Sequence, residues 1–200
     1  MSLRPEISGF HLNRLRSTLG CDDSAVAERA VAHARQIYNA DSLQPAVSNT
    51  VRDLVTGGRP APKEEDETLI HAVIALAFFE QEHLETDSNT WNSYFVDWAL
   101  EEWAVGDSGP VLPPDADAAL RERISDLLFD ALLGRPLIGE SQRSDWTTYG
   151  YLTHDEVGEL IGYSHRFPGL RVDEHGFGAD FFGWLDTIHG AGLDYWFFSQ

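Results

Sequence analysis

A carboxylate and a histidine occur three residues apart at two places in this sequence: Glu80 with His83, and Asp186 with His189. On a helix this spacing puts the acid and the imidazole on one face, as in the Glu-x-x-His motif of di-iron helical bundles. Both histidines fall at predicted helix ends, where histidine commonly stabilises the terminal carbonyl groups. Two further inward glutamates are not evident, so the pattern favours helix capping and no metal site is predicted.

His71 lies inside an apolar segment, between Ile70 and Ala72. A histidine in such surroundings is typical of a hydrogen-bonded core residue. The alternative is a buried general base, although no nucleophile or orienting acid is visible in the sequence. That alternative describes an enzyme whose site surrounds a central helix and uses His71, Glu80 and His83.

Other chemistry-bearing residues have weaker patterns. Cys21 is the sole cysteine, which excludes a cysteine metal cage, and it is interpreted as a small structural or surface residue. The Asp173-Glu174-His175 cluster is typical of an exposed polar turn. The GxSxG, P-loop, HExxH and GxGxxG motifs are all missing from the sequence. A non-enzymatic role is therefore favoured, and no cofactor is predicted.

The formal net charge of −19 is distributed unevenly along the 200 residues. Between residues 64 and 120 there is no Lys and no Arg, whereas fourteen acidic residues occur there: Glu64, Glu65, Asp66, Glu67, Glu80, Glu82, Glu85, Asp87, Asp97, Glu101, Glu102, Asp107, Asp115 and Asp117. A solvated helical surface would explain this segment. A focused negative field that steers a basic partner toward the protein would explain it equally well.

The second explanation predicts an acidic protein-binding module, such as an immunity-type inhibitor of a basic toxin or of a nucleic-acid-binding protein. The residues predicted to bind this basic protein partner are Glu64, Glu65, Asp66, Glu67, Asp97, Glu101 and Glu102. Direct binding to nucleic acid or to an anionic membrane is disfavoured, because both carry negative charge. With no long apolar run and no apolar signal core near Met1, a cytoplasmic protein is expected.

Hydrophobic periodicity and turn residues predict the elements that must position these residues. The expected strands are 7–10, 149–152 and 193–199. The expected helices are 12–20, 24–37, 41–57, 66–83, 90–106, 115–133, 154–163 and 179–188. Helix 66–83 is apolar nearly all round and should be buried, and Thr153 with Glu156 matches a capping box. The prediction is a mostly helical single α+β domain over residues 1–200, with a small sheet of about three short strands.

Helix 90–106 is rich in aromatic residues at helical spacing, from Trp91 to Trp103. If these side chains face inward they belong to the core. If one or two are exposed, Trp and Tyr beside carboxylates would form an anchor for an arginine-rich partner.

Several segments at the two ends of the chain also show a resemblance to a known family. They are GFHLNRLRSTLGCDD, VRDLVTGGRP, YGYLTHDEV and WLDTIHGAGLDYWFF. Together they resemble a bacterial family catalogued as a domain of unknown function, distantly related to the YfbM-like proteins. The resemblance implies the α+β fold and a bacterial cytoplasmic protein, and it fits a loose similarity to small acidic immunity proteins. It implies no catalytic residues.

Overall fold

The computed structural model describes residues 7–38, 44–57, 67–81, 83–85, 116–137, 148–172 and 177–199. It confirms the mostly helical α+β fold. The chain divides into two compact units, of which the first is mainly Phe10–His83. The second combines Glu6–Gly9, Leu84–Pro136 and Ser141–Gln200. The single-domain expectation stays a prediction, and each unit is described by itself.

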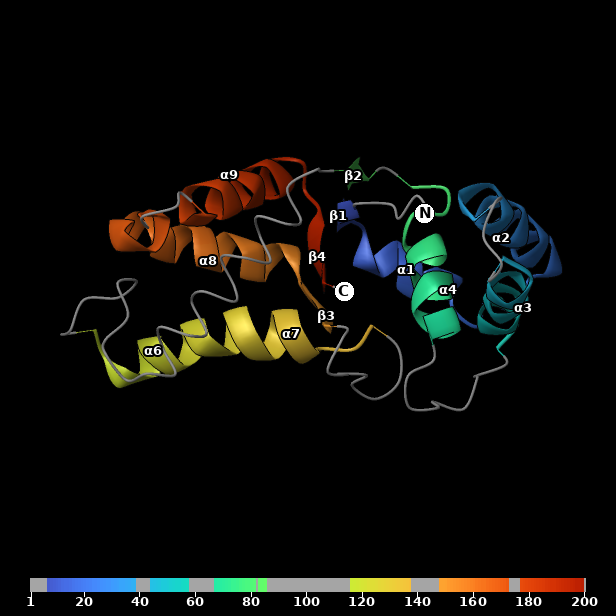
Figure 1. Ribbon diagram of the computed structural model, residues 1–200, viewed down its shortest axis with the longest axis horizontal. Helices are drawn as coiled ribbons and strands as arrows, with labels where there is room; N and C mark the ends of the chain where they lie inside the picture. The colour runs from blue at the N-terminus through green and yellow to red at the C-terminus, as the bar shows by residue number, and fades with distance from the viewer. Residues whose placement is uncertain are drawn as a thin grey trace. The chain divides into compact units, whose positions relative to one another are not determined.

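The first unit is helical. Its helices are α1 (Leu12–Thr18), α2 (Ser24–Ile37), α3 (Gln44–Val55) and α4 (Glu67–Ala77). Helices α2 and α3 pack side by side, and both contact α4 (Figure 1). Asp23 caps α2 by accepting the backbone N–H groups of Ala25 and Val26 at 2.8 and 3.2 Å, which explains why the helix begins there.

Glycines end two of these helices at the places expected from the sequence. Gly20 follows α1 with φ of +66°, and Gly57 follows α3 with φ of +83°. Such left-handed backbone favours glycine. The N–H of Gly20 donates to the carbonyl of Leu54 at 2.8 Å, which ties the end of α1 to the end of α3.

Helix α4 is the buried helix of the first unit, as its apolar composition predicts. Every side chain from Leu69 to Phe79 is buried, and the neighbouring helices contribute small and branched apolar side chains such as Ala30 and Val51. The helix is shorter than expected, however, because it ends at Ala77 and not near His83. A turn follows in which Glu80 adopts a left-handed φ of +51°.

The second unit contains a four-stranded sheet with the order β2-β1-β4-β3. The strands are β1 (Ile7–Phe10), β2 (Leu84–Glu85), β3 (Thr148–Leu152) and β4 (Asp194–Ser199). Both β1 with β2 and β3 with β4 pair antiparallel. The two-residue strand β2 was not expected, since so short a segment has no periodicity to reveal it.

The remaining elements of the second unit are helical. They are α6 (Ala118–Ser125), the π-helical segment η1 (Asp126–Ala131), α7 (Leu132–Gly134), α8 (His154–Arg166), the 3₁₀ segment η2 (Pro168–Arg171) and α9 (Phe177–Gly190). Of these, η1, α7, α8 and α9 contact the sheet. Helices α8 and α9 run side by side, and both contact β4 (Figure 1). Apolar side chains such as Ile124, Leu160, Phe181 and Tyr195 form the core. The predicted capping box of Thr153 and Glu156 is confirmed.

Candidate functional site

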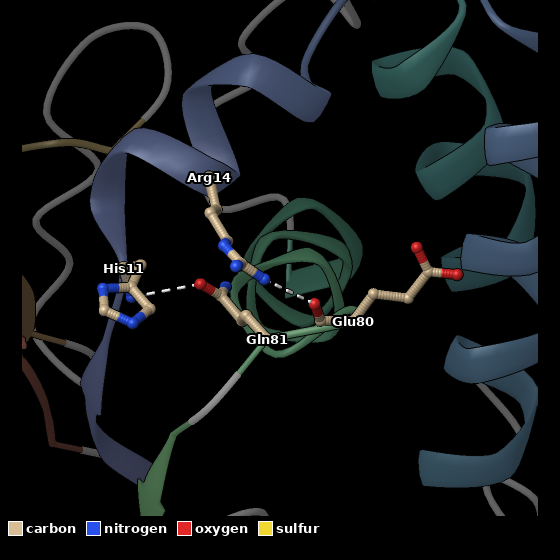
Figure 2. Close-up of a pocket in the computed structure, with 4 residues that line it drawn as sticks. All are labelled: His11, Arg14, Glu80 and Gln81. Atoms are coloured by element: carbon tan, nitrogen blue, oxygen red, sulfur yellow. Dashed lines mark hydrogen bonds between the residues drawn. The ribbon is translucent and has the colours of Figure 1, made fainter.

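A pocket of about 540 Å³ lies in the first unit, where the start of α1 approaches the turn after α4. Its described lining consists of His11, Arg14, Glu80 and Gln81 (Figure 2). Pockets of this size are typical of small-molecule sites. The first two residues come from α1 and its N-cap, and the last two come from the turn.

The turn after α4 joins the two sides of the pocket through two hydrogen bonds. The left-handed backbone at Glu80 directs its carbonyl toward α1, where it accepts Nη1 of Arg14 at 3.0 Å. The side-chain oxygen Oε1 of Gln81 accepts the backbone N–H of His11 at 3.1 Å. Both bonds are drawn as dashed lines in Figure 2. They fix the positions of the Arg14 guanidinium and of the Gln81 amide.

The carboxylate of Glu80 points away from the other three lining residues (Figure 2). It accepts Nε of Arg29 on α2 at 2.6 Å and Nη2 at 3.4 Å. Hydrogen bonding from Arg29 lowers the pKa of Glu80, with the charges of Arg29 and His33 acting in the same direction. Glu80 is therefore an ionised partner of Arg29 and a weak general base.

Two further histidines lie near Glu80. Burial lowers the pKa of His33 on α2, the positive charge of His83 lowers it further, and Glu80 opposes the shift. The rings of His33 and Phe79 are 6.0 Å apart, and those of His83 and Phe78 are 5.2 Å apart. Sequence reasoning missed His33, because its only signal is a spacing of four residues from Arg29 on the same helix.

The expected position of His83 at the end of helix α4 is wrong, and so is the helical spacing of Glu80 and His83. The helix ends at Ala77, and Glu80 lies in the left-handed turn, so the two residues do not share one helical face. His71 remains within α4, where it is buried and its Nδ1 lies 3.1 Å from the hydroxyl of Tyr38. This confirms the hydrogen-bonded core histidine.

The predicted partner-binding residues fall almost entirely outside the described residues. Glu64, Glu65, Asp66, Asp97, Glu101 and Glu102 all lie there, and so do the aromatic residues Trp91–Trp103 and the Asp173-Glu174-His175 cluster. Glu67 begins α4. Three other acids of segment 64–120 are described, of which Glu85 ends β2. Asp117 caps α6 through the N–H of Ala119 at 2.8 Å, and Glu80 is paired with Arg29. Although segment 64–120 contains no Lys or Arg of its own, Arg29 thus opposes the charge of Glu80.

The second acid–histidine pair, Asp186 and His189, lies on α9. Asp186 accepts Nη1 of Arg171 at 2.9 Å. The ring of His189 stacks on that of His154 at the start of α8, with centroids 4.2 Å apart and planes 6° from parallel. Both side chains thus hold elements of the second unit together. Cys21 is an exposed free cysteine.

Within the described ranges, no group of three or more His, Cys, Asp or Glu side chains is placed to hold a metal ion. No helix in that part of the chain has the length and apolar character needed to cross a membrane. No family model, no curated protein and no solved structure matches the chain. The family resemblance of the terminal segments therefore stays an expectation.

Proposed function

We propose that this protein binds a basic protein partner through the carboxylates of segment 64–120, as an immunity-type inhibitor would bind a basic toxin or a nucleic-acid-binding protein. The observation that supports this proposal is that most of the described arginine ion pairs involve carboxylates outside segment 64–120. The protein has only 14 Lys and Arg against 33 acidic residues. Where those cations are bound decides how many carboxylates remain for a partner.

Five arginines form ion pairs within the described residues, and four of them bind carboxylates outside segment 64–120. Arg52 binds Glu28 at 3.1 Å, and Arg171 binds Asp186 at 2.9 Å. Arg123 binds Glu159 at 2.7 Å, and Arg135 binds Glu156. Among the ion pairs of the described residues, the pair of Arg29 with Glu80 involves a member of the acidic segment. Four of the five arginines paired within the described residues are therefore bound to carboxylates outside that segment.

A negative field at the acidic segment favours a positively charged partner and accelerates its encounter. The partner should be a protein, since nucleic acids and anionic membranes are repelled by the same field. The attraction acts over a Debye length of about 8 Å at physiological salt, so it should weaken as salt rises. Binding that survives high salt unchanged would need a different explanation.

The test is affinity capture on the immobilised full chain from extracts of the native cell, at about 50 mM and about 500 mM salt. Two variants with the same change in net charge are compared. The first neutralises the acidic segment (Glu64→Gln, Glu65→Gln, Asp66→Asn, Glu67→Gln). The second neutralises exposed acids elsewhere (Asp53→Asn, Glu122→Gln, Asp130→Asn, Asp180→Asn).

We expect a basic protein to be retained at low salt and released at high salt. The affinity of the purified partner should fall about tenfold or more for the first variant and change little for the second. Equal losses for both variants would show that net charge alone attracts the partner. That result, or the absence of a salt-sensitive basic partner, would overturn the proposal.

The alternative of an enzyme that uses His71, Glu80 and His83 has less support. His71 is bound to Tyr38 within the core, and the carboxylate of Glu80 is engaged by Arg29 with its pKa lowered. A base that is matched to neutral pH would need the opposite shift.

A further inference from the structure

We infer that the pocket between α1 and the turn after α4 binds a small organic molecule through an oxyanion, a carboxylate or a phosphate group. Glu80 and Gln81 belong to segment 64–120. The pocket nevertheless differs from the carboxylates of that segment, because its side chains offer hydrogen-bond donors and a positive charge. The inference rests on the orientation of Arg14, Glu80 and Gln81, each of which makes a described hydrogen bond.

Arg14 supplies the charge. A guanidinium carries five N–H donors in a planar fork, which matches the geometry of carboxylate and phosphate groups. The carbonyl of Glu80 accepts one nitrogen, Nη1, at 3.0 Å. This contact orients the fork beside the pocket while leaving further donors of the same group for a ligand. A bidentate bond from such a fork is among the strongest polar contacts available to an anion.

Gln81 supplies two further donors. Its Oε1 accepts the N–H of His11, so the orientation of the amide is set and Nε2 carries the two N–H groups. This Nε2 is buried and has no hydrogen-bond partner among the described residues. A buried donor without an acceptor costs free energy. An oxyanion next to Arg14 would supply the missing acceptor.

The one carboxylate of the described lining does not oppose an anion from within. Glu80 directs its carboxylate away from the pocket and onto Arg29, in a fork at 2.6 and 3.4 Å (Figure 2). It contributes only its backbone carbonyl to the pocket side, and Arg14 covers that carbonyl. The described lining therefore favours an anion, although the formal net charge of the whole chain is −19.

The volume indicates what the oxyanion is attached to. The pocket is open to solvent on one side, and its volume of about 540 Å³ leaves room for more than a single inorganic anion. The ligand should therefore carry an organic body, with its acid group held by Arg14 and Gln81.

The experiment is calorimetric titration of the full chain, at constant ionic strength, with two matched pairs of probes. Succinate is compared with succinamide, and glucose 6-phosphate with glucose, so that each pair differs only in the acid group. The variants are Arg14→Gln, which removes the charge, and Gln81→Glu, which keeps the acceptor for His11 but replaces the donors with a carboxylate. Arg16→Gln on the same helix is the charge-matched control, and circular dichroism verifies that each variant is folded.

We expect saturable binding of at least one acid and none of its neutral counterpart, which also tells carboxylate from phosphate recognition. Affinity should fall about tenfold or more in Arg14→Gln and in Gln81→Glu, and by less than about twofold in Arg16→Gln. If neither acid binds saturably up to about 10 mM, or if Arg16→Gln weakens binding as much as Arg14→Gln, the inference is wrong. Equal binding of an acid and its neutral counterpart would also contradict it.

Discussion

Glu156 joins α8 to the segment that follows α7 through one carboxylate. It completes the capping box of α8 by accepting the backbone N–H of Thr153 at 2.9 Å. It also accepts Nη2 of Arg135, which follows α7, at 2.9 Å. Burial raises the pKa of Glu156, but hydrogen bonds from Arg135 and Thr153 outweigh burial and hold the pKa below its ordinary value. The folded protein therefore favours the ionised form.

This shift predicts a pH dependence of stability. Because the folded pKa lies below the unfolded value of about 4.5, Glu156 stabilises the fold above that pH, and the contribution is lost as pH falls through the folded pKa. We expect Glu156→Gln to lower the free energy of unfolding by about 1–3 kcal/mol at pH 7. The deficit should shrink in acid. Urea unfolding at pH 7 and pH 3 measures both values.

The exposed residue Glu122 on α6 provides the control for this measurement. Glu122→Gln should change the free energy of unfolding by less than about 0.5 kcal/mol, as surface substitutions usually do. A deficit for Glu156→Gln that is equally large at both pH values would show that packing, and not the charge, accounts for its effect.

The residue contacts that could be predicted are the local ones. The capping box needs only Thr153 and Glu156, three residues apart, and Asp23 precedes the helix it caps. Arg135 and Arg29 could not be assigned to their partners, because those partners lie 21 and 51 residues away. Such contacts depend on how helices pack, which local patterns do not specify. The pocket also depends on contacts between residues that are distant in the sequence, such as Arg14 with Glu80.

Gly150 lets strand β3 pass close to the end of the helix that precedes it. A Cβ built at Gly150 would lie far inside van der Waals contact with the backbone carbonyls of Ala131 and Leu132, where η1 meets α7. Backbone atoms cannot move aside as a flexible side chain can. Glycine is therefore required here by the close approach of two backbones.

Gly150→Ala should accordingly lower the free energy of unfolding by more than about 3 kcal/mol, or prevent folding. Gly162→Ala on α8 is the matched control, because a Cβ there meets nothing within 4 Å. In a helix this exchange should instead stabilise by about 0.5–1 kcal/mol. Denaturant unfolding of both variants gives opposite signs if the close approach is real. A mild effect of Gly150→Ala would refute it.

At the scale of elements, periodicity predicted the helices better than their ends. The glycines after α1 and α3 gave clear stops, whereas the turn after α4 contains neither glycine nor proline. Glu80 adopts the left-handed conformation there. A residue other than glycine rarely does so, and the sequence therefore does not predict the turn. The same reasoning missed η1, since its buried Leu127, Leu128 and Ala131 follow ordinary helical spacing.

For the whole molecule, the sequence predicted the fold class and located the charge, but it indicated no division of the chain. Each compact unit combines segments from distant parts of the sequence. In the second unit, Glu6–Gly9 groups with Leu84–Pro136 and Ser141–Gln200. A division of that kind leaves no linker in the composition. Ten of the fourteen acids of segment 64–120 lie outside the described residues, so the proposed role of the segment rests on the sequence and on the ion pairs found elsewhere.

The net charge of −19 makes a prediction about the molecule as a whole. Self-repulsion destabilises a compact chain, and salt screens charges separated by more than the Debye length, which falls from about 30 Å at 0.01 M to about 8 Å at 0.15 M. The ion pairs that stabilise the fold, such as Arg123 with Glu159 at 2.7 Å, are short and partly buried and should be screened less. We therefore expect Tm to rise between these salt concentrations, by about 2–4 °C for each kcal/mol of repulsion removed. Thermal unfolding followed by circular dichroism measures the rise.

The variant neutralised at Glu64, Glu65, Asp66 and Glu67 should show a smaller increase in Tm, because it starts with less repulsion. A Tm that falls with salt would mean that attractive pairs dominate, and that the surplus carboxylates are matched within the protein and are not left for a partner.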